Sequence, residues 1–141
     1  KVVFFSADGK CRSKIGFNQK RCTGILGSYD AAGKVLTLAS YTLPKEPADY
    51  VNSEWKIQEN PYGGDAVNSY NDGPPAPGKK PLGPFYELES SSPAAALAPG
   101  ATAEHVHRTV HLQGSEAELD RVAQAALGVS LKQIETAFVK P

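Results

Sequence analysis

The sequence of 141 residues contains no methionine, one tryptophan and only two cysteines. Two thiols do not make a disulfide framework, although Cys11 and Cys22 could close one small loop. We expect both cysteines to be reduced and structural, with a single disulfide as the alternative. Because a first methionine is also missing, we expect a processed product or a part of a longer protein. The compartment therefore cannot be read from the N-terminus.

An excess of charge of either sign is also lacking, since 15 lysines and arginines balance 15 aspartates and glutamates. Without a basic excess or a polybasic run, we expect neither nucleic acid nor a membrane as a partner. No apolar run approaches the ~20 residues that span a bilayer, and the apolar residues 2–5 are too few for a signal peptide. What is present, 40% hydrophobic residues, is ordinary for a folded domain with its own core.

Short segments of alternating polarity precede Gln113, and turn signals separate them. This pattern predicts a mainly β, antiparallel fold. Asp8-Gly9 and residues 30–34 carry turn chemistry, which predicts a hairpin at each place. The expected strands are residues 2–6, 11–15, 25–29, 35–43, 50–58, 83–92 and 101–113.

Two helices are expected at the C-terminal end. Ser115 with Glu118 forms a capping box before an apolar stripe, and Ser130 with Gln133 precedes a shorter one. The expected organisation is an antiparallel β-sandwich portion over residues 1–114, with a helical tail over residues 115–141 packed on the same domain.

The strand at residues 83–92 carries two acidic side chains on one face. Alternation places Phe85, Glu87 and Glu89 together, with the two carboxylates ~6.5–7 Å apart along the strand. Neighbouring carboxylates resist ionising together, so one pKa is expected to rise. A carboxylate prepared in this way can transfer protons near neutral pH. The alternative is a solvated strand face that carries two glutamates by chance.

Polar side chains also gather in residues 60–72. Asn68, Asn71 and Asp72 offer hydrogen-bond donors and acceptors within a short span, which suits a ligand rich in hydroxyl groups. Turn chemistry is an equally good explanation, because asparagine and aspartate favour turns. The proline-rich residues 73–84 that follow are expected to form a lid or rim over a site, with a domain linker as the rival interpretation.

Two further side chains are candidates for ligand contact. Trp55 could stack on a sugar ring, although a lone tryptophan is also typical of a core. Arg108 falls on the apolar face of the expected strand 101–113. A buried arginine needs a carboxylate, which Glu87 or Glu89 could provide.

Three histidines share the other face of the same expected strand: His105, His107 and His111. A His-x-His pair can bind zinc, but His111 lies ~13 Å from His107 along a strand, too far to share one ion. We therefore expect no metal ion, and no other cofactor.

Three longer motifs resemble a known family. They are Asn60-Pro61-Tyr62-Gly63-Gly64-Asp65 with Asn68 to Pro74, Leu82 to Ala94, and His105-x-His107-Arg108-Thr109-x-His111-Leu112-Gln113-Gly114. Together they resemble the C-terminal part of the galactose mutarotase-like (aldose 1-epimerase-like) superfamily, and within it bacterial proteins of unassigned function. The resemblance implies a large antiparallel β-sandwich that binds sugars in an open cleft. It also implies a bacterial protein, either cytoplasmic or periplasmic and secreted.

The resemblance also implies roles for individual residues. Mutarotases interconvert sugar anomers, and their late glutamate, which accepts the anomeric hydroxyl proton, corresponds to Glu89 by motif. Their histidine acid belongs to a portion of the family domain that this chain lacks. The sugar-site hypothesis adds roles that the resemblance does not give: Glu87 as electrostatic neighbour of Glu89, and Arg108 as the residue that orients a glutamate. The residues expected to bind the sugar are Asn68, Asn71, Asp72, Glu87, Arg108 and Trp55.

Three functions follow as hypotheses. The first is a sugar-binding protein that interconverts anomers with Glu89 as general base. The second is a carbohydrate-binding module without turnover, or a domain associated with a glycoside hydrolase. The third is a structural half-sandwich whose edge pairs with itself or with a partner. The expected partners are a sugar or oligosaccharide, and either a second copy of this chain or the missing half of the domain.

Overall fold

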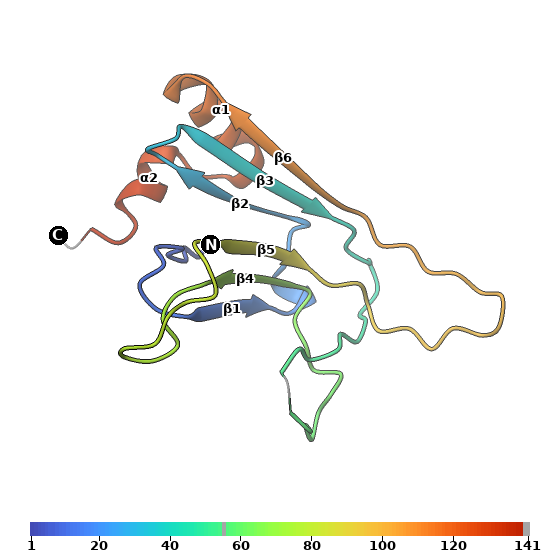
Figure 1. Ribbon diagram of the computed structural model, residues 1–141. Coiled ribbons are helices and arrows are strands. Elements are labelled where there is room, and N and C mark those ends of the chain that lie inside the picture. The colour runs from blue at the N-terminus through green and yellow to red at the C-terminus, as the bar shows by residue number, and fades with distance from the viewer. Residues whose placement is uncertain (55, 140–141) are drawn as a thin grey trace. The chain divides into compact units, whose positions relative to one another are not determined.

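The computed structural model describes residues 1–54 and 56–139. Within these ranges six strands form two antiparallel sheets of three strands, in the orders β1-β4-β5 and β2-β3-β6 (Figure 1). The expected mainly β, antiparallel character is confirmed. The strands are β1 (Ser13–Phe17), β2 (Ile25–Asp30), β3 (Val35–Tyr41), β4 (Val67–Asn71), β5 (Tyr86–Ser90) and β6 (His107–Gln113). The helices are a 3-10 turn (Gln19–Arg21), α1 (Glu116–Leu127) and α2 (Leu131–Thr136).

The chain divides into two compact units. The first combines Lys1–Ser6, Ile25–Ser40 and the chain from Arg108 onward. Its β2-β3 hairpin is paired from Ile25↔Ser40 to Asp30↔Val35, which confirms the hairpin expected from the turn at residues 30–34.

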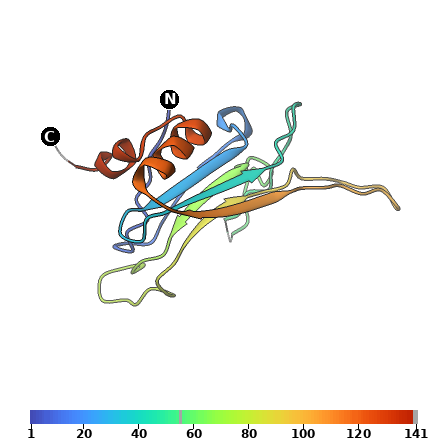
Figure 2. The same cartoon turned by 90° about the horizontal axis from the view of Figure 1, so that it is seen from above.

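Helices α1 and α2 lie on one face of the β2-β3-β6 sheet (Figure 2). Their contact is a buried apolar cluster in which no member is more than 3% exposed: Leu36, Leu119, Ala123 and Leu131. Both expected capping boxes are present, at Ser115 and at Ser130. Gly128 ends α1 with φ of 71°, a left-handed conformation that glycine adopts without steric cost.

The second unit combines Ala7–Gly24 with Tyr41–His107 and contains the β1-β4-β5 sheet. Strand β4 is central and pairs antiparallel with both neighbours. Its register places Lys14, Tyr70 and Glu87 in one cross-strand row, and Gly16, Asn68 and Glu89 in the next. Side chains in two such rows share a face of the sheet.

Three expected strands differ most from the structure. Residues 2–6 form no strand, and Val2 and Val3 are half exposed. The described residues of 50–58 contain only an isolated bridge from Tyr50 to Gly63. The last expected strand begins at His107 and not at residue 101. Alternating polarity stabilises a strand only where a partner strand supplies hydrogen bonds.

No helix in the described part of the chain is long and apolar enough to cross a membrane. The expected boundary at residue 114 stays a prediction. The structure groups the segment that follows it with β2 and β3, because α1 and α2 pack on Leu36.

Candidate functional site

One side of the β1-β4-β5 sheet carries the acidic pair that the sequence singled out. Phe85, Glu87 and Glu89 alternate along this side, and the ring of Phe85 lies 5.9 Å from that of Tyr70 on the neighbouring strand. The expected alternation of β5 is therefore confirmed. We call this side the polar face and define it by six residues: Lys14, Gly16, Asn68, Tyr70, Glu87 and Glu89.

Glu89 forms an ion pair with Lys14 across the sheet, with 2.9 Å between Lys14 Nζ and Glu89 Oε2. Its other oxygen, Oε1, is buried, and among the described residues no donor bonds to it while Glu87 is ionised. A buried acceptor without a donor costs free energy. Glu89 thus presents an oxygen that can accept a hydrogen bond from a ligand or from a protonated neighbour.

Glu87 supplies that neighbour. Partial burial raises its pKa above the ordinary glutamate value, and the negative charge of Glu89 raises it further. The Lys14 ammonium opposes this shift without cancelling it. A protonated Glu87 can donate a hydrogen bond to Glu89, so the pair can hold one proton between them. The expected rise of one pKa in the pair falls on Glu87.

Asn68 lies beside Glu89 in the register and is only 9% exposed. Opposite it, Gly16 leaves the space that two polar side chains fill. A Cβ at this position would clash with the carboxylate of Asp65 and would lie 2.5 Å from Oδ1 of Asn68. The absence of a side chain at Gly16 thus allows Asp65 and Asn68 to approach the glutamate row.

Asp72 lies just beyond β4 and is 2% exposed. Its carboxylate accepts hydrogen bonds from the Tyr70 hydroxyl at 2.7 Å and from the Gly83 backbone N–H at 2.8 Å, and Arg12 lies 3.7 Å away. Burial pushes the pKa of Asp72 upward, but these three groups and a backbone hydrogen bond from Leu82 together hold it below the ordinary value. The contacts tie the end of the proline-rich connection to β4.

Asn71 does not join the other predicted ligand residues, because an odd offset along a strand turns a side chain to the opposite face. It is 2% exposed, and both amide atoms are engaged. Its Oδ1 accepts from the Gly9 N–H at 3.0 Å, and its Nδ2 donates to the Cys11 carbonyl at 2.9 Å. Asn71 therefore lies on the side opposite Asn68, and its expected contact with a ligand stays a prediction.

Two other predicted site residues, Arg108 and Trp55, are not among the residues that define the polar face. The side chain of Arg108 is exposed, so its expected burial is wrong and it needs no buried carboxylate. The charged partner of Glu89 is Lys14 instead. Trp55 lies outside the described residues, and its expected contact with a sugar stays a prediction.

The histidines take part in hydrogen bonds with hydroxyl groups. His111 Nδ1 lies 2.9 Å from Thr37 Oγ1, whereas His105 and His107 both bond to Ser90 Oγ. No group of three histidine, cysteine, aspartate or glutamate side chains suited to a metal ion occurs in residues 1–54 and 56–139. Cys11 and Cys22 are both free thiols.

Three members of the polar face were not assigned to the site by sequence reasoning: Lys14, Gly16 and Tyr70. Lys14 stands 75 residues from Glu89 in the chain, and only the pairing of β1 with β4 brings the two together. Nothing in the sequence near Lys14 shows which carboxylate it meets.

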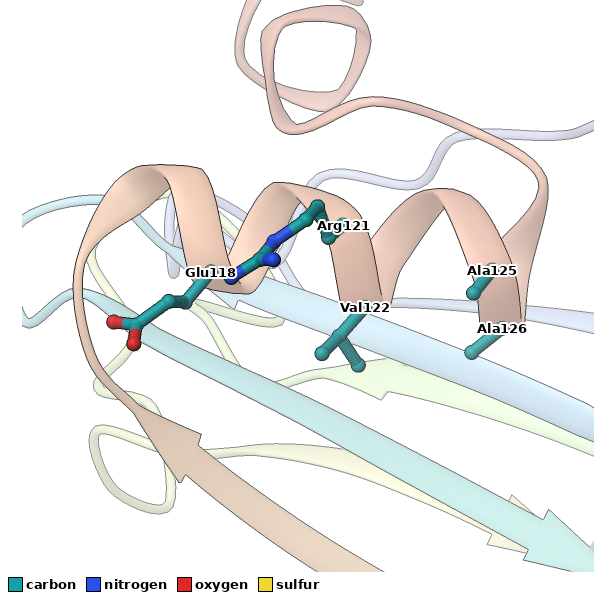
Figure 3. A pocket seen from close by; sticks show the side chains of 5 residues that line it. All are labelled: Glu118, Arg121, Val122, Ala125 and Ala126. Atoms are coloured by element: carbon teal, nitrogen blue, oxygen red, sulfur yellow. The ribbon is translucent and has the colours of Figure 1, made fainter.

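A separate hollow lies along α1, in the first unit (Figure 3). No residue that the sequence singled out as a ligand contact belongs to it. Its lining is Glu118, Arg121, Val122, Ala125 and Ala126.

Comparison with known proteins yields one match. A family described as "Family of unknown function (DUF6786)" matches residues 1–138. No curated protein and no solved structure matches the chain.

Proposed function

The chain belongs to DUF6786, a family of unknown function, and we propose that its polar face binds a sugar and accepts a proton from it. The observation that carries the proposal is the glutamate pair. Glu89 is held by Lys14 at 2.9 Å and keeps one buried oxygen without a donor, and Glu87 beside it has a raised pKa.

A sugar offers hydroxyl groups, which can act as the donor that the buried oxygen of Glu89 lacks among the described residues. A sugar hydroxyl can donate to Oε1 of Glu89, and Asn68 can both donate and accept. The face and its immediate surroundings are acidic, since Glu87, Glu89 and the neighbouring Asp65 outnumber Lys14. Acidic surroundings favour a neutral ligand over an anionic one. A neutral aldose therefore fits better than a sugar acid.

Glu89 is the general base of the proposed reaction. It takes the anomeric hydroxyl proton, the ring opens, and closure on the other side of the carbonyl gives the second anomer. Lys14 holds the Glu89 carboxylate in place through the ion pair at 2.9 Å. Glu87, as the group that holds a proton more readily, is the acid available on the same face.

The similarity of three sequence motifs to the galactose mutarotase-like superfamily supports this choice of reaction. The same similarity supports the finer fold that we propose for the two antiparallel sheets, the β-sandwich of that superfamily. It does not supply the histidine acid, which lies in a part of the family domain that this chain lacks.

Polarimetry of a freshly dissolved single anomer tests the proposal. Glu89→Gln keeps the shape of the side chain but removes the base, so we expect the catalysed rate to fall by ~10²–10⁴-fold. The matched control is Glu54→Gln, which removes another glutamate paired with a lysine, at 2.7 Å and well exposed. A Glu89→Gln protein with an unchanged rate would show that Glu89 is not the base.

A carbohydrate-binding module without turnover is the second candidate. The ion pair with Lys14 favours it, because a carboxylate held at 2.9 Å from an ammonium is a fixed acceptor for a ligand hydroxyl. Saturable sugar binding without any catalysed anomer exchange would identify this function.

A further inference from the structure

Ser90 lies between two imidazole rings in the second unit. Its Oγ is 2.9 Å from His105 Nε2 and 2.8 Å from His107 Nδ1. Ser90 follows Glu89 on β5, so it points to the side opposite the polar face. The cluster is therefore separate from the proposed sugar site.

Backbone hydrogen bonds fix both sides of this cluster. Val106, between the two histidines, donates to Thr42 Oγ1 at 3.0 Å and accepts from the Thr42 N–H at 2.9 Å. Ser90 is paired with Val67 in the sheet, and the following residue, Ser91, donates to the Ala66 carbonyl at 3.0 Å. Serine and histidines are thus held in place before any ligand arrives.

The number of protons on Ser90 and His105 decides which group donates in each of the two serine–histidine hydrogen bonds. A hydroxyl has one proton, so Ser90 can donate to one imidazole and must accept from the other. Nδ1 of His105 is buried and has no partner among the described residues. A buried N–H left unpaired is rarer in proteins than an underused acceptor, so Nε2 of His105 carries its proton and donates to Ser90. Ser90 therefore donates to His107.

We propose that Ser90 is a nucleophile activated by His107, for acyl transfer from a small uncharged ester. The distance of 2.8 Å between nucleophile and base lies within the range that such pairs need. His107 is exposed, so an ester can reach the pair from solvent. The segment from Ser90 to Ala103 contains no charged residue, which favours an uncharged acyl group.

The reaction balances without any further reagent. Ser90 Oγ forms a bond to the acyl carbon as its proton passes to His107 Nδ1, and the bond from that carbon to the alcohol oxygen breaks. The alcohol leaves with the proton from His107. Water then attacks the acyl-serine while His107 takes its proton, and Ser90 regains a proton as the carboxylic acid leaves. The sum is ester plus water to acid plus alcohol.

Acylation by p-nitrophenyl acetate tests the proposal on the full chain. We expect a burst of p-nitrophenolate and, by mass spectrometry of the peptides, an acetyl group on Ser90. Ser90→Ala should remove the burst. His107→Asn keeps a hydrogen-bonding group near the Nδ1 position but removes the base, and should lower the acylation rate by ~100-fold or more.

His111→Asn is the matched control, because His111 also bonds a hydroxyl, that of Thr37, at 2.9 Å. Thr37 is only 6% exposed and should not be acylated, so this variant should keep the wild-type burst. An acetyl group found on a histidine or lysine and not on Ser90 would overturn the proposal. An equal Ser90 acylation rate in His107→Asn would also overturn it. Mass spectrometry of peptides from the unsubstituted chain shows which residue carries the acetyl group, so this criterion holds even if Ser90→Ala folds poorly.

Discussion

Replacing Gly73 with alanine is a sharp test of how the second unit is packed. A Cβ at this position would lie 2.5 Å from the carbonyl carbon of Cys11 and 2.7 Å from its backbone nitrogen. Real Cβ atoms essentially never approach other atoms within 3.0 Å, so one of the two backbones must move.

The backbone of Cys11 has little freedom to retreat. Its carbonyl accepts from Asn71 Nδ2 at 2.9 Å, and the next residue, Arg12, donates to the Pro74 carbonyl at 3.2 Å. Overpacking of a fixed core costs ~1–3 kcal/mol, and obstruction by backbone places Gly73→Ala at the upper end. With roughly 3–4 °C per kcal/mol for a chain of this size, we expect the melting temperature to fall by about 6–12 °C.

Thermal unfolding followed by circular dichroism measures this fall, with Gly16→Ala as the comparison. At Gly16 the obstructing atoms are the ends of the Asp65 and Asn68 side chains, which can rotate away, so we expect a loss below about 1 kcal/mol. A Gly73→Ala protein that melts within about 1 °C of the unsubstituted chain, or a larger loss for Gly16→Ala, would refute this packing.

Two further predictions concern Glu87 and the second helix. The raised pKa of Glu87 means that the folded state binds its proton more tightly than the unfolded state, so this group stabilises the fold at acidic pH and loses that contribution as pH rises. Glu87→Gln should therefore be more stable than the unsubstituted chain at pH 7, with the difference vanishing at acidic pH in urea titrations; equal curves at both pH values would contradict the shift. Ser130→Ala removes the hydroxyl that accepts from the Gln133 N–H at 3.2 Å in the α2 capping box. Its expected cost is ~1 kcal/mol, or a melting temperature about 3–4 °C lower, and an unchanged melting temperature would show that this cap does not stabilise the fold.

Local signals explain which elements the sequence predicts well. The hairpin of β2 and β3 follows from a turn between two alternating segments, and each capping box lies within four residues of its helix start. The strand with Glu87 and Glu89 was also predictable, because turn residues and proline bound it on both sides.

Contacts that depend on the pairing of distant strands could not be predicted from the sequence. The ion pair of Lys14 with Glu89 depends on the order β1-β4-β5, which no local pattern encodes. Asn71 is a different case, because residues 67–71 were not among the expected strands, and the alternation of that strand turns Asn71 away from Asn68. Arg108 was expected on a buried face, yet β6 is exposed along most of its length.

Chemical-shift mapping by NMR tests the central claim, that the polar face binds a sugar, most directly. Backbone amide shifts of the ¹⁵N-labelled chain would be followed as free neutral aldoses are titrated in. We expect saturable shifts centred on the amides of Lys14, Asn68, Glu87 and Glu89, reduced in Asn68→Ala and unchanged in Glu54→Gln. Saturable shifts centred on the α1 hollow, or no saturable shift with any neutral aldose, would contradict it.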